Sequence, residues 1–172
     1  EHFYAEVIKV LQNGSNILEI GTWLGKSTCF LGECIRASKK DIKVYAVDSF
    51  AGEDTCEFQI NKVTSNGGTI FNEFWKNVND LNLQNIIYPV ISESYNCVEK
   101  LDCKEFDFIF IDADHKYLPV KKDVETLFPY LKPRGIFAGH DYEKEVQQAV
   151  DEFLASKNLK AHRAGMCWYL QN

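Results

Sequence analysis

The chain has 172 residues, 45% of them hydrophobic and 26% charged, which is typical of one globular domain and excludes a disordered chain. Its net charge of -6 disfavours a nucleic-acid partner, because phosphate binding needs clustered Lys and Arg. We expect neither a membrane-spanning run nor a signal peptide from this sequence. Its six cysteines form no C-x-x-C pair, which argues against zinc and predicts reduced thiols in a cytoplasmic protein. The chain begins with Glu1 and not with Met, so an upstream segment is compatible with the sequence.

The first half of the chain alternates between predicted helices and strands. A helix over residues 2–12 ends at Asn13-Gly14, and a strand over 17–20 leads through a glycine turn into a helix over 26–38. A strand over 44–47 precedes residues 51–69, which are polar and irregular, and then a helix over 70–81. We interpret 51–69 as a lid or substrate loop, with a plain surface excursion as the equal alternative.

The second half continues the alternation. Pro89 in a strand over 86–91 removes a ladder donor and so predicts an edge strand, and the apolar run 106–111 predicts a strand buried on both faces. Helices follow over 93–101, 118–131 and 143–157, with a turn at 133–135 and a strand over 136–138. Strands over 160–163 and 166–170, joined at 164–165, form a hairpin. The pattern predicts one domain over 1–172 with a doubly wound α/β sheet and a mixed edge.

The stretch N-I-L-E-I-G-T-W-L-G-K-S-T, residues 16–28, reads as strand, glycine turn and helix. A helix start presents free backbone N–H groups that suit an anionic ligand. The dinucleotide fingerprint fails because Trp23 stands at its second glycine, and the phosphate loop is one residue short. The pattern E-x-G-x-x-x-G-x-S resembles motif I of class I S-adenosylmethionine (SAM) dependent methyltransferases, and it is carried by Glu19, Gly21, Gly25 and Ser27. A turn without a ligand is the alternative.

Polar or ionisable side chains follow each of the first five predicted strands. Ligands of open α/β sheets bind beyond the carboxyl ends of the strands, so we expect a site at this edge. In strand order the residues are Glu19 and Gly21; Asp48; Ser92, Glu93 and Ser94; Asp112, Asp114 and His115; and His140 and Asp141. Asp48 suits the two hydroxyls of a ribose, with an ordinary loop residue as the alternative. Ser94 is predicted to cap the helix that it begins.

Two further blocks extend the resemblance. They are F-D-F-I-F-I-D-A-D-H-K-Y over 106–117 and L-K-P-R-G-I-F-A-G-H-D-Y over 131–142. With the glycine turn and V-D-S-F at 47–50, they resemble the small class I O-methyltransferases. The likeness is to the catechol and caffeoyl-coenzyme A group and, more closely, to the D-x-D-H-x-Y group with macrocin O-methyltransferase-like members. It covers about residues 17–142 and implies a Rossmann-like sheet of seven strands, order 3-2-1-4-5-7-6, with the last strand antiparallel.

The resemblance also implies how SAM is held. Gly21 and its neighbours pack against the methionyl part, and Ser27 lies near its carboxylate. Asp48 holds the ribose, and Ser94 and Tyr95 lie near the adenine. The implied cofactor-binding set is Glu19, Gly21, Thr22, Trp23, Gly25, Ser27, Asp48, Ser49, Phe50, Ser92, Glu93, Ser94, Tyr95 and Asp112.

Catechol-type relatives hold a divalent metal with the first Asp of D-A-D and an Asp-Asn pair after the fifth strand. These positions are Asp112, Asp141 and Tyr142 here. Because Tyr142 replaces the Asn ligand, His140 is the expected substitute, which shifts the preference from Mg²⁺ towards Mn²⁺, iron or zinc.

The lysine base of those relatives falls at His115, with Lys116 adjacent, so the implied catalytic set is His115, Lys116 and His140. An imidazole can accept a proton near neutral pH. A helix-start histidine bonded to the backbone is the alternative for His115, and a structural role is equally open for His140.

These features predict a SAM-dependent methyltransferase that acts on a hydroxyl of a small molecule or sugar. No nucleic acid or membrane is expected as a partner, and a homodimer is compatible with the sequence. Two alternatives stay open: an NAD(P)-dependent oxidoreductase, which the missing G-x-G-x-x-G disfavours, and a non-catalytic SAM-binding module. The sequence does not name the acceptor.

Overall fold

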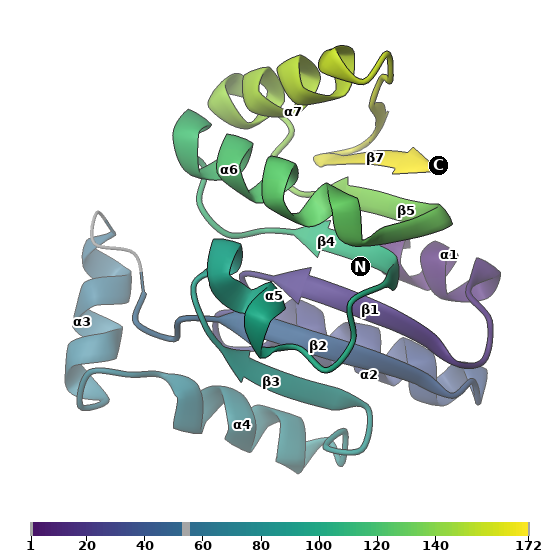
Figure 1. The fold of residues 1–172 in the computed structure, drawn as a ribbon. Helices are drawn as coiled ribbons and strands as arrows, with labels where there is room; N and C mark the ends of the chain where they lie inside the picture. Colours follow the sequence, from purple (N-terminus) through teal and green to yellow (C-terminus); the bar gives the residue numbers. More distant parts are fainter. Residues whose placement is uncertain (1, 53–55, 172) are drawn as a thin grey trace.

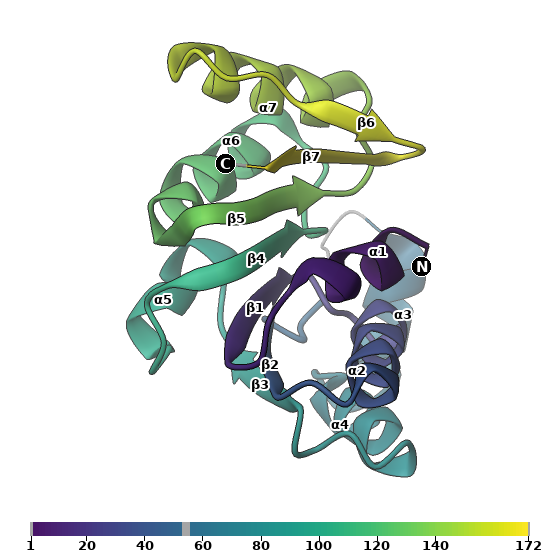
Figure 2. The ribbon, with the colours of Figure 1, turned by 90° about the vertical axis from the view of Figure 1, so that its right-hand side faces the viewer.

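A seven-stranded sheet forms the centre of the molecule, with helices on both faces (Figures 1 and 2). The structure is a computed structural model that describes residues 2–52 and 56–171. The strands are β1 Ser15–Ile20, β2 Ile42–Asp48, β3 Ile87–Ile91, β4 Phe106–Ile111, β5 Leu131–Gly139, β6 His162–Ala164 and β7 Cys167–Gln171. The α-helices are α1 His2–Val10, α2 Lys26–Ser38, α3 Glu57–Ser65, α4 Phe71–Asp80, α5 Cys97–Lys100, α6 Tyr117–Leu127 and α7 Lys144–Ser156. Short 3₁₀ helices, η1 Ser94–Asn96 and η2 Phe128–Tyr130, precede α5 and follow α6.

The strand order is β3-β2-β1-β4-β5-β7-β6, which confirms the order implied by the sequence. Strands β1 to β5 pair in parallel, whereas β7 runs antiparallel to both of its neighbours, β5 and β6. β3, which contains Pro89, lies at the edge as predicted. The carboxyl ends of the five parallel strands therefore meet along one rim of the sheet.

Two apolar layers hold the helices on the sheet. On one face of the sheet, side chains from β1, β2 and β4 pack with α1, α2 and α4. On the other face, the alternate side chains of the same strands pack with α5, α6 and α7. Adjacent residues of β1 serve opposite layers, since Ile17 belongs to the first and Leu18 to the second, and neither is exposed. This double burial explains why the central strands are mostly apolar.

The structure corrects the prediction for residues 51–69. Residues 57–65 form α3, which stands beyond the carboxyl ends of the strands at the left of Figure 1. The expected irregular segment is therefore wrong over this range. The part of the same prediction that falls on residues 53–55 lies outside the described residues.

The region between α6 and β5 also differs from the prediction. The expected helix over 118–131 ends as an α-helix at Leu127, and Leu131 already belongs to β5. The expected turn at 133–135 lies inside β5, where the register against β4 shifts and Arg134 adopts a φ of 66°. A bulge accommodates the turn-forming residues without ending the strand.

The remaining elements match the predictions to within a few residues. Helix α2 has the expected bounds, and β6 and β7 form the expected antiparallel hairpin, with its turn one residue later. All six cysteines are free thiols. In the described part of the chain, no helix is long and apolar enough to cross a membrane.

Candidate active site

The site begins where β1 and β4 separate, because the chain leaves these neighbouring strands in opposite directions. Ligands of doubly wound sheets bind at such a switch point. Gly21 follows β1 with a φ of 83°, and a Cβ on it would lie 2.1 Å from the backbone oxygen of Asp112, which follows β4. The first motif glycine is therefore required for packing the two strand ends together.

A cavity of about 520 Å³ opens at this switch point, within the size range of ligand sites. Its walls come from the residues that follow β1 to β4, and from α3 and α6. They are Ile20, Gly21, Trp23, Val47, Asp48, Ser49, Gly52, Gln59, Ser92, Glu93, Ser94, Tyr95, Asp112, Ala113, Asp114, His115, Leu118, Pro119, Lys122 and Asp123.

Asp48 links two backbone turns at the cavity wall. Its Oδ2 accepts a hydrogen bond from the backbone N–H of Trp23, and its Oδ1 accepts one from that of Phe50, both at 2.7 Å. Trp23 and Phe50 have φ values of 48° and 55°, in the left-handed region that bulky residues rarely adopt. Since each carboxylate oxygen has a further lone pair, Asp48 can bind these turns and a ligand together.

Nine of the predicted cofactor-binding residues line the cavity: Gly21, Trp23, Asp48, Ser49, Ser92, Glu93, Ser94, Tyr95 and Asp112. Ser92 is only 6% exposed, and its hydroxyl has no hydrogen-bond partner within the described residues. A buried hydroxyl without a partner is costly, so it fits a wall that meets a polar ligand.

The other five predicted cofactor residues lie outside the lining: Glu19, Thr22, Gly25, Ser27 and Phe50. Glu19 is fully buried and accepts a hydrogen bond from the Tyr4 hydroxyl at 2.8 Å. Burial raises the pKa of the Glu19 carboxyl, and the hydroxyls of Thr28, Ser27 and Tyr4 oppose that rise. Phe50 is also fully buried and packs against Phe71 and Phe74. These residues support the site from behind.

Ser94 does not cap a helix, so that prediction is wrong. Glu93 occupies the cap position of η1 without a side-chain bond, and the Ser94 hydroxyl instead donates to the carboxyl of Asp123 on α6. Sequence reasoning missed Asp123, which lines the cavity and is 3% exposed. The available signal was periodicity, because Asp123 lies on the same helix face as Val120, Val124 and Leu127.

Four side chains form a polar cluster beside the cavity, which we call the His–Asp cluster: Asp112, His115, His140 and Asp141. His115 Nε2 lies 2.8 Å from Asp141 Oδ2, and His140 Nδ1 lies 3.1 Å from the same oxygen and 3.9 Å from Asp112 Oδ1. Ligand atoms of Asp112, His115 and Asp141 lie within 4.8 Å of one another, close enough to hold one metal ion. His115, and not the predicted His140, completes this group with Asp112 and Asp141.

The pKa values of the two carboxyls in the His–Asp cluster are shifted in opposite directions. Burial raises the pKa of Asp112, against the opposing charge of His140. Burial would also raise the pKa of Asp141, but the hydrogen bonds and charges of His140 and His115 outweigh it and lower the pKa. Asp141 is therefore a carboxylate, which can only accept hydrogen bonds. In the neutral tautomer that donates its Nε2–H to Asp141, His115 has Nδ1 as its acceptor nitrogen.

The other predicted residues of this region lie apart from the cluster. Lys116 is exposed, lines no part of the cavity and donates its backbone N–H to Asp114 at the start of α6. Tyr142 stands where catechol-type relatives have an Asn ligand, but it is buried and donates its hydroxyl to Asp151 of α7. Tyr117, the last residue of the D-x-D-H-x-Y block, bonds Glu152 at 2.5 Å and so joins α6 to α7.

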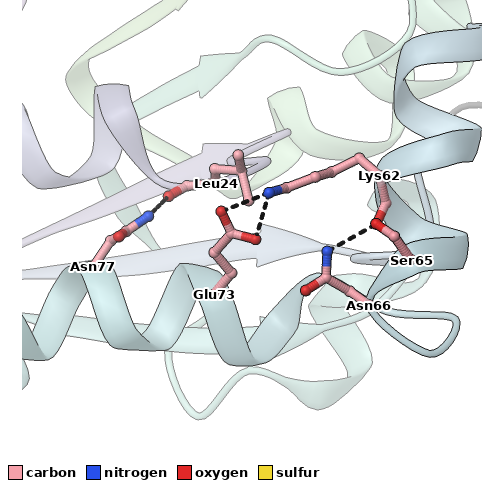
Figure 3. Close-up of polar contacts among 6 residues, drawn as sticks. All are labelled: Leu24, Lys62, Ser65, Asn66, Glu73 and Asn77. Carbon is pink, nitrogen blue, oxygen red and sulfur yellow. Dashed lines mark hydrogen bonds and ion pairs between the residues drawn. The ribbon is translucent and has the colours of Figure 1, made fainter.

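Helix α4 holds two walls of the site in place (Figure 3). Its Glu73 pairs with Lys62 of α3 at 2.8 Å, and its Asn77 donates a side-chain hydrogen bond to the backbone oxygen of Leu24 in the glycine turn. Val63 of α3 also packs close to Gly52, where a Cβ would come within 2.9 Å of it. Helix α3 is thereby fixed next to the turn that carries Trp23.

The chain matches the family model described as a methyltransferase domain over residues 18–142. A search of curated proteins finds an uncharacterized protein, y4gI of Sinorhizobium fredii, 25% identical over 128 residues. That match covers 74% of this chain but only 13% of the relative, so the chain spans a small part of that protein's length.

Solved structures with the same fold include enzymes with different acceptors. The O-methyltransferase NovP aligns with a TM-score of 0.80 at 17% identity, over 99% of this chain and 78% of NovP. An rRNA methylase from Streptococcus thermophilus aligns with a TM-score of 0.66 at 17% identity, over 99% and 93%.

A third similar structure contains a cofactor product. SMU.1697c, a candidate methyltransferase from Streptococcus mutans solved with S-adenosylhomocysteine (SAH), aligns with a TM-score of 0.65 at 14% identity, over 98% of this chain and 93% of that protein. At such identities, the structures establish the fold, and the family model establishes the family. The chain belongs to the methyltransferase-domain family and has the class I fold of SAM-dependent methyltransferases.

Proposed function

We propose that this chain transfers a methyl group from SAM to a hydroxyl of a small molecule or sugar. The observation that carries the proposal is the cavity at the switch point of the sheet, which ends beside the His–Asp cluster. A ligand site and a candidate proton acceptor thus adjoin each other. The O-methyltransferase NovP, similar in fold, supports the choice of oxygen as the acceptor atom. The six free thiols suit a cytoplasmic location.

The cavity residues fit SAM by their chemistry. Asp48 has carboxylate lone pairs for the two ribose hydroxyls, and Ser92 has a buried hydroxyl without a partner within the described residues. Trp23 and Tyr95 supply aromatic walls, and Gly21 leaves its backbone accessible at the cavity. SAM, when bound, supplies an electrophilic methyl group on a sulfonium. The chain's contribution is to orient it and to exclude water.

We propose His115 as the group that takes the acceptor's proton. Nε2 is bonded to Asp141, so Nδ1 remains available, and Asp141 holds the ring orientation and stabilises the imidazolium that forms. The acceptor oxygen forms its bond to the methyl carbon as the sulfur–carbon bond breaks and its electrons return to sulfur. The hydroxyl proton passes to His115, and SAH leaves as a neutral thioether.

The same cluster also fits a divalent metal. Asp112, His115 and Asp141 would hold it, with two carboxylates and one imidazole as ligands that suit Mn²⁺, iron or zinc. A bound cation would lower the pKa of the acceptor hydroxyl. His115 would then act as a ligand and not as a base, so the two assignments make different predictions.

Methyl transfer to a panel of catechols and sugar hydroxyls, measured by mass spectrometry, tests the proposal. We expect His115→Ala to lower kcat by about a hundredfold or more, as loss of a general base does. His162→Ala, which removes an exposed histidine of β6, is the matched control and should leave kcat unchanged. Turnover that survives EDTA would favour the base, and turnover lost to EDTA and restored by Mn²⁺ would favour the metal.

Three outcomes would overturn the proposal. Binding of NAD(P) in place of SAH would indicate an oxidoreductase. SAH binding without turnover on any acceptor would indicate a non-catalytic module. Methylation of RNA, the substrate class named for one protein of similar fold, would replace the acceptor class.

A further inference from the structure

An acidic residue interrupts the apolar face of α6. Val120, Val124 and Leu127 point into the core, and Asp123 lies among them with 3% of its surface exposed. A carboxyl in this position costs stability unless polar partners compensate for lost water. Asp123 lies outside every motif that relates the chain to methyltransferases, so the family resemblance does not explain it.

The residues around Asp123 line part of the cavity. The Ser94 hydroxyl donates a hydrogen bond to Asp123 Oδ1, and it supplies the only hydrogen bond to this carboxyl within the described residues. Tyr95 is adjacent to Ser94, and the Lys122 ammonium lies 3.2 Å from the centre of its ring. Leu118 and Pro119 complete this wall. An aromatic ring, apolar side chains and one fixed carboxyl suit a flat heterocycle with a polar edge.

We propose that Asp123 is the residue that selects adenine, its carboxyl accepting a hydrogen bond from the exocyclic amino group while Ser94 fixes its orientation. This inference rests on the proposed SAM-dependent function. It assigns the nucleobase to the part of the cavity lined by α6 and η1, and the ribose to the part lined by Asp48. The sequence resemblance implied only Ser94 and Tyr95 near the adenine.

Besides Asp48 and the cluster residue Asp112, two other carboxyls line the cavity, and both are less suited to this role. Glu93 is exposed, so water competes for its oxygens. Asp114 Oδ1 already accepts the backbone N–H of Lys116 at 2.7 Å. A buried carboxyl discriminates more strongly between ligands with and without the amino group. Water cannot reach it to replace the hydrogen bond that is lost when the amino group is missing.

Calorimetric binding of two ligands tests the inference. SAH carries the amino group, whereas S-inosylhomocysteine carries a carbonyl oxygen at the same position. We expect the wild-type chain to bind SAH at least about tenfold more tightly, because the carbonyl would face the Asp123 carboxyl. Asp123→Ala should reduce this preference to about threefold or less, and Ser94→Ala should reduce it by a smaller factor.

Glu125→Ala, an exposed carboxyl on the same helix, is the matched control and should keep the wild-type preference. If Asp123→Ala does not fold, Asp123→Asn serves, because an amide can donate to the carbonyl oxygen and should also narrow the preference. The inference is wrong if wild type binds both ligands equally, or if folded variants keep the preference or weaken both ligands by the same factor. A wild-type chain that binds neither ligand would instead overturn the proposed function.

Discussion

The buried carboxyl of Asp123 shows how a binding site can oppose the stability of the fold. Burial raises its pKa to about 6, and the charges of Asp114 and Glu93 act in the same direction, while Ser94 and Lys122 oppose it. Burial raises the pKa of the Cys97 thiol on α5, and the charge of Asp123 raises it as well. A neutral residue would make this helix face more stable, so its presence favours a role in binding.

This arrangement makes stability depend on pH in a defined direction. The folded chain holds the Asp123 proton more tightly than the unfolded chain. Protonation of Asp123 therefore stabilises the fold at low pH, and this stabilisation is lost as pH rises through about 6. Relative to Asp123→Asn, the wild-type free energy of unfolding should fall by about 1–2 kcal/mol from about pH 5 to about pH 7.5.

Denaturant unfolding of both chains at the two pH values measures this difference, with the exposed Glu125→Gln on α6 as the control for a lost charge. A difference between wild type and Asp123→Asn that is constant with pH, or that grows in the wild type's favour as pH rises, would contradict the assignment.

The sequence predicted those candidate site residues that lie at or just beyond the end of a single strand. Asp48, Asp112 and His115 come directly after apolar runs, so the ends of parallel strands predicted their common edge. It could not reveal that the Ser94 hydroxyl meets Asp123, because that contact joins η1 to a helix 29 residues further along. The sequence also predicted Phe50 as a cofactor-binding residue, and the structure gives it a left-handed backbone and a fully buried side chain.

At the scale of elements, α3 was missed because its sequence lacks an apolar stripe. Phe58 and Ile60 are 68% and 42% exposed, and Val63 is the buried residue of this helix. Helices are normally recognised by the face that they bury, and α3 buries little. Tertiary contacts to α4 and Gly52 hold it instead. The bulge in β5 escaped prediction for a related reason, since Pro133 and Gly135 are typical of turns.

The contact between α3 and α4 should therefore control the mobility of the cavity wall. Lys62→Met removes the ion pair with Glu73, in which both side chains are about one-third exposed. Such pairs contribute about 0–1 kcal/mol, so global stability should change little. We expect faster amide hydrogen exchange over residues 57–65, because few buried apolar contacts remain to hold α3.

A second ion pair on α4 provides the matched control. Lys76 and Asp80 form an exposed pair one helical turn apart, and Lys76→Met should leave exchange in α3 unchanged. Equal exchange in wild type and Lys62→Met would show that the ion pair with Glu73 does not hold α3.

Across the whole molecule, polar groups at the amino ends of the strands make different contacts from those at the carboxyl ends. At the amino ends of the strands, Asp107 is satisfied by the backbone N–H of Asn16 and by Lys132, at 2.8 and 2.9 Å. Nearby, the Lys40 ammonium bonds three backbone oxygens at the end of α1. At the carboxyl ends, Asp48, Asp112 and Asp123 line a cavity. The polar groups at the amino ends are therefore paired within the protein, whereas those at the carboxyl ends offer hydrogen-bond acceptors to a ligand.

This polarity predicts where SAH binding will stabilise the chain. Amide hydrogen exchange should slow at the rim, over residues 20–25, 47–52, 92–96 and 112–123, because a ligand that binds only the folded state suppresses local opening there. At the opposite ends of the strands, SAH should not change the rate of exchange through local openings. These segments are residues 13–16, 41–44 and 104–107. β6, at the end of the sheet furthest from β1, provides an internal reference. Slower exchange confined to β5, β6 and β7, or equally strong at both ends of the strands, would place the ligand elsewhere, since residues from all four rim segments line the cavity.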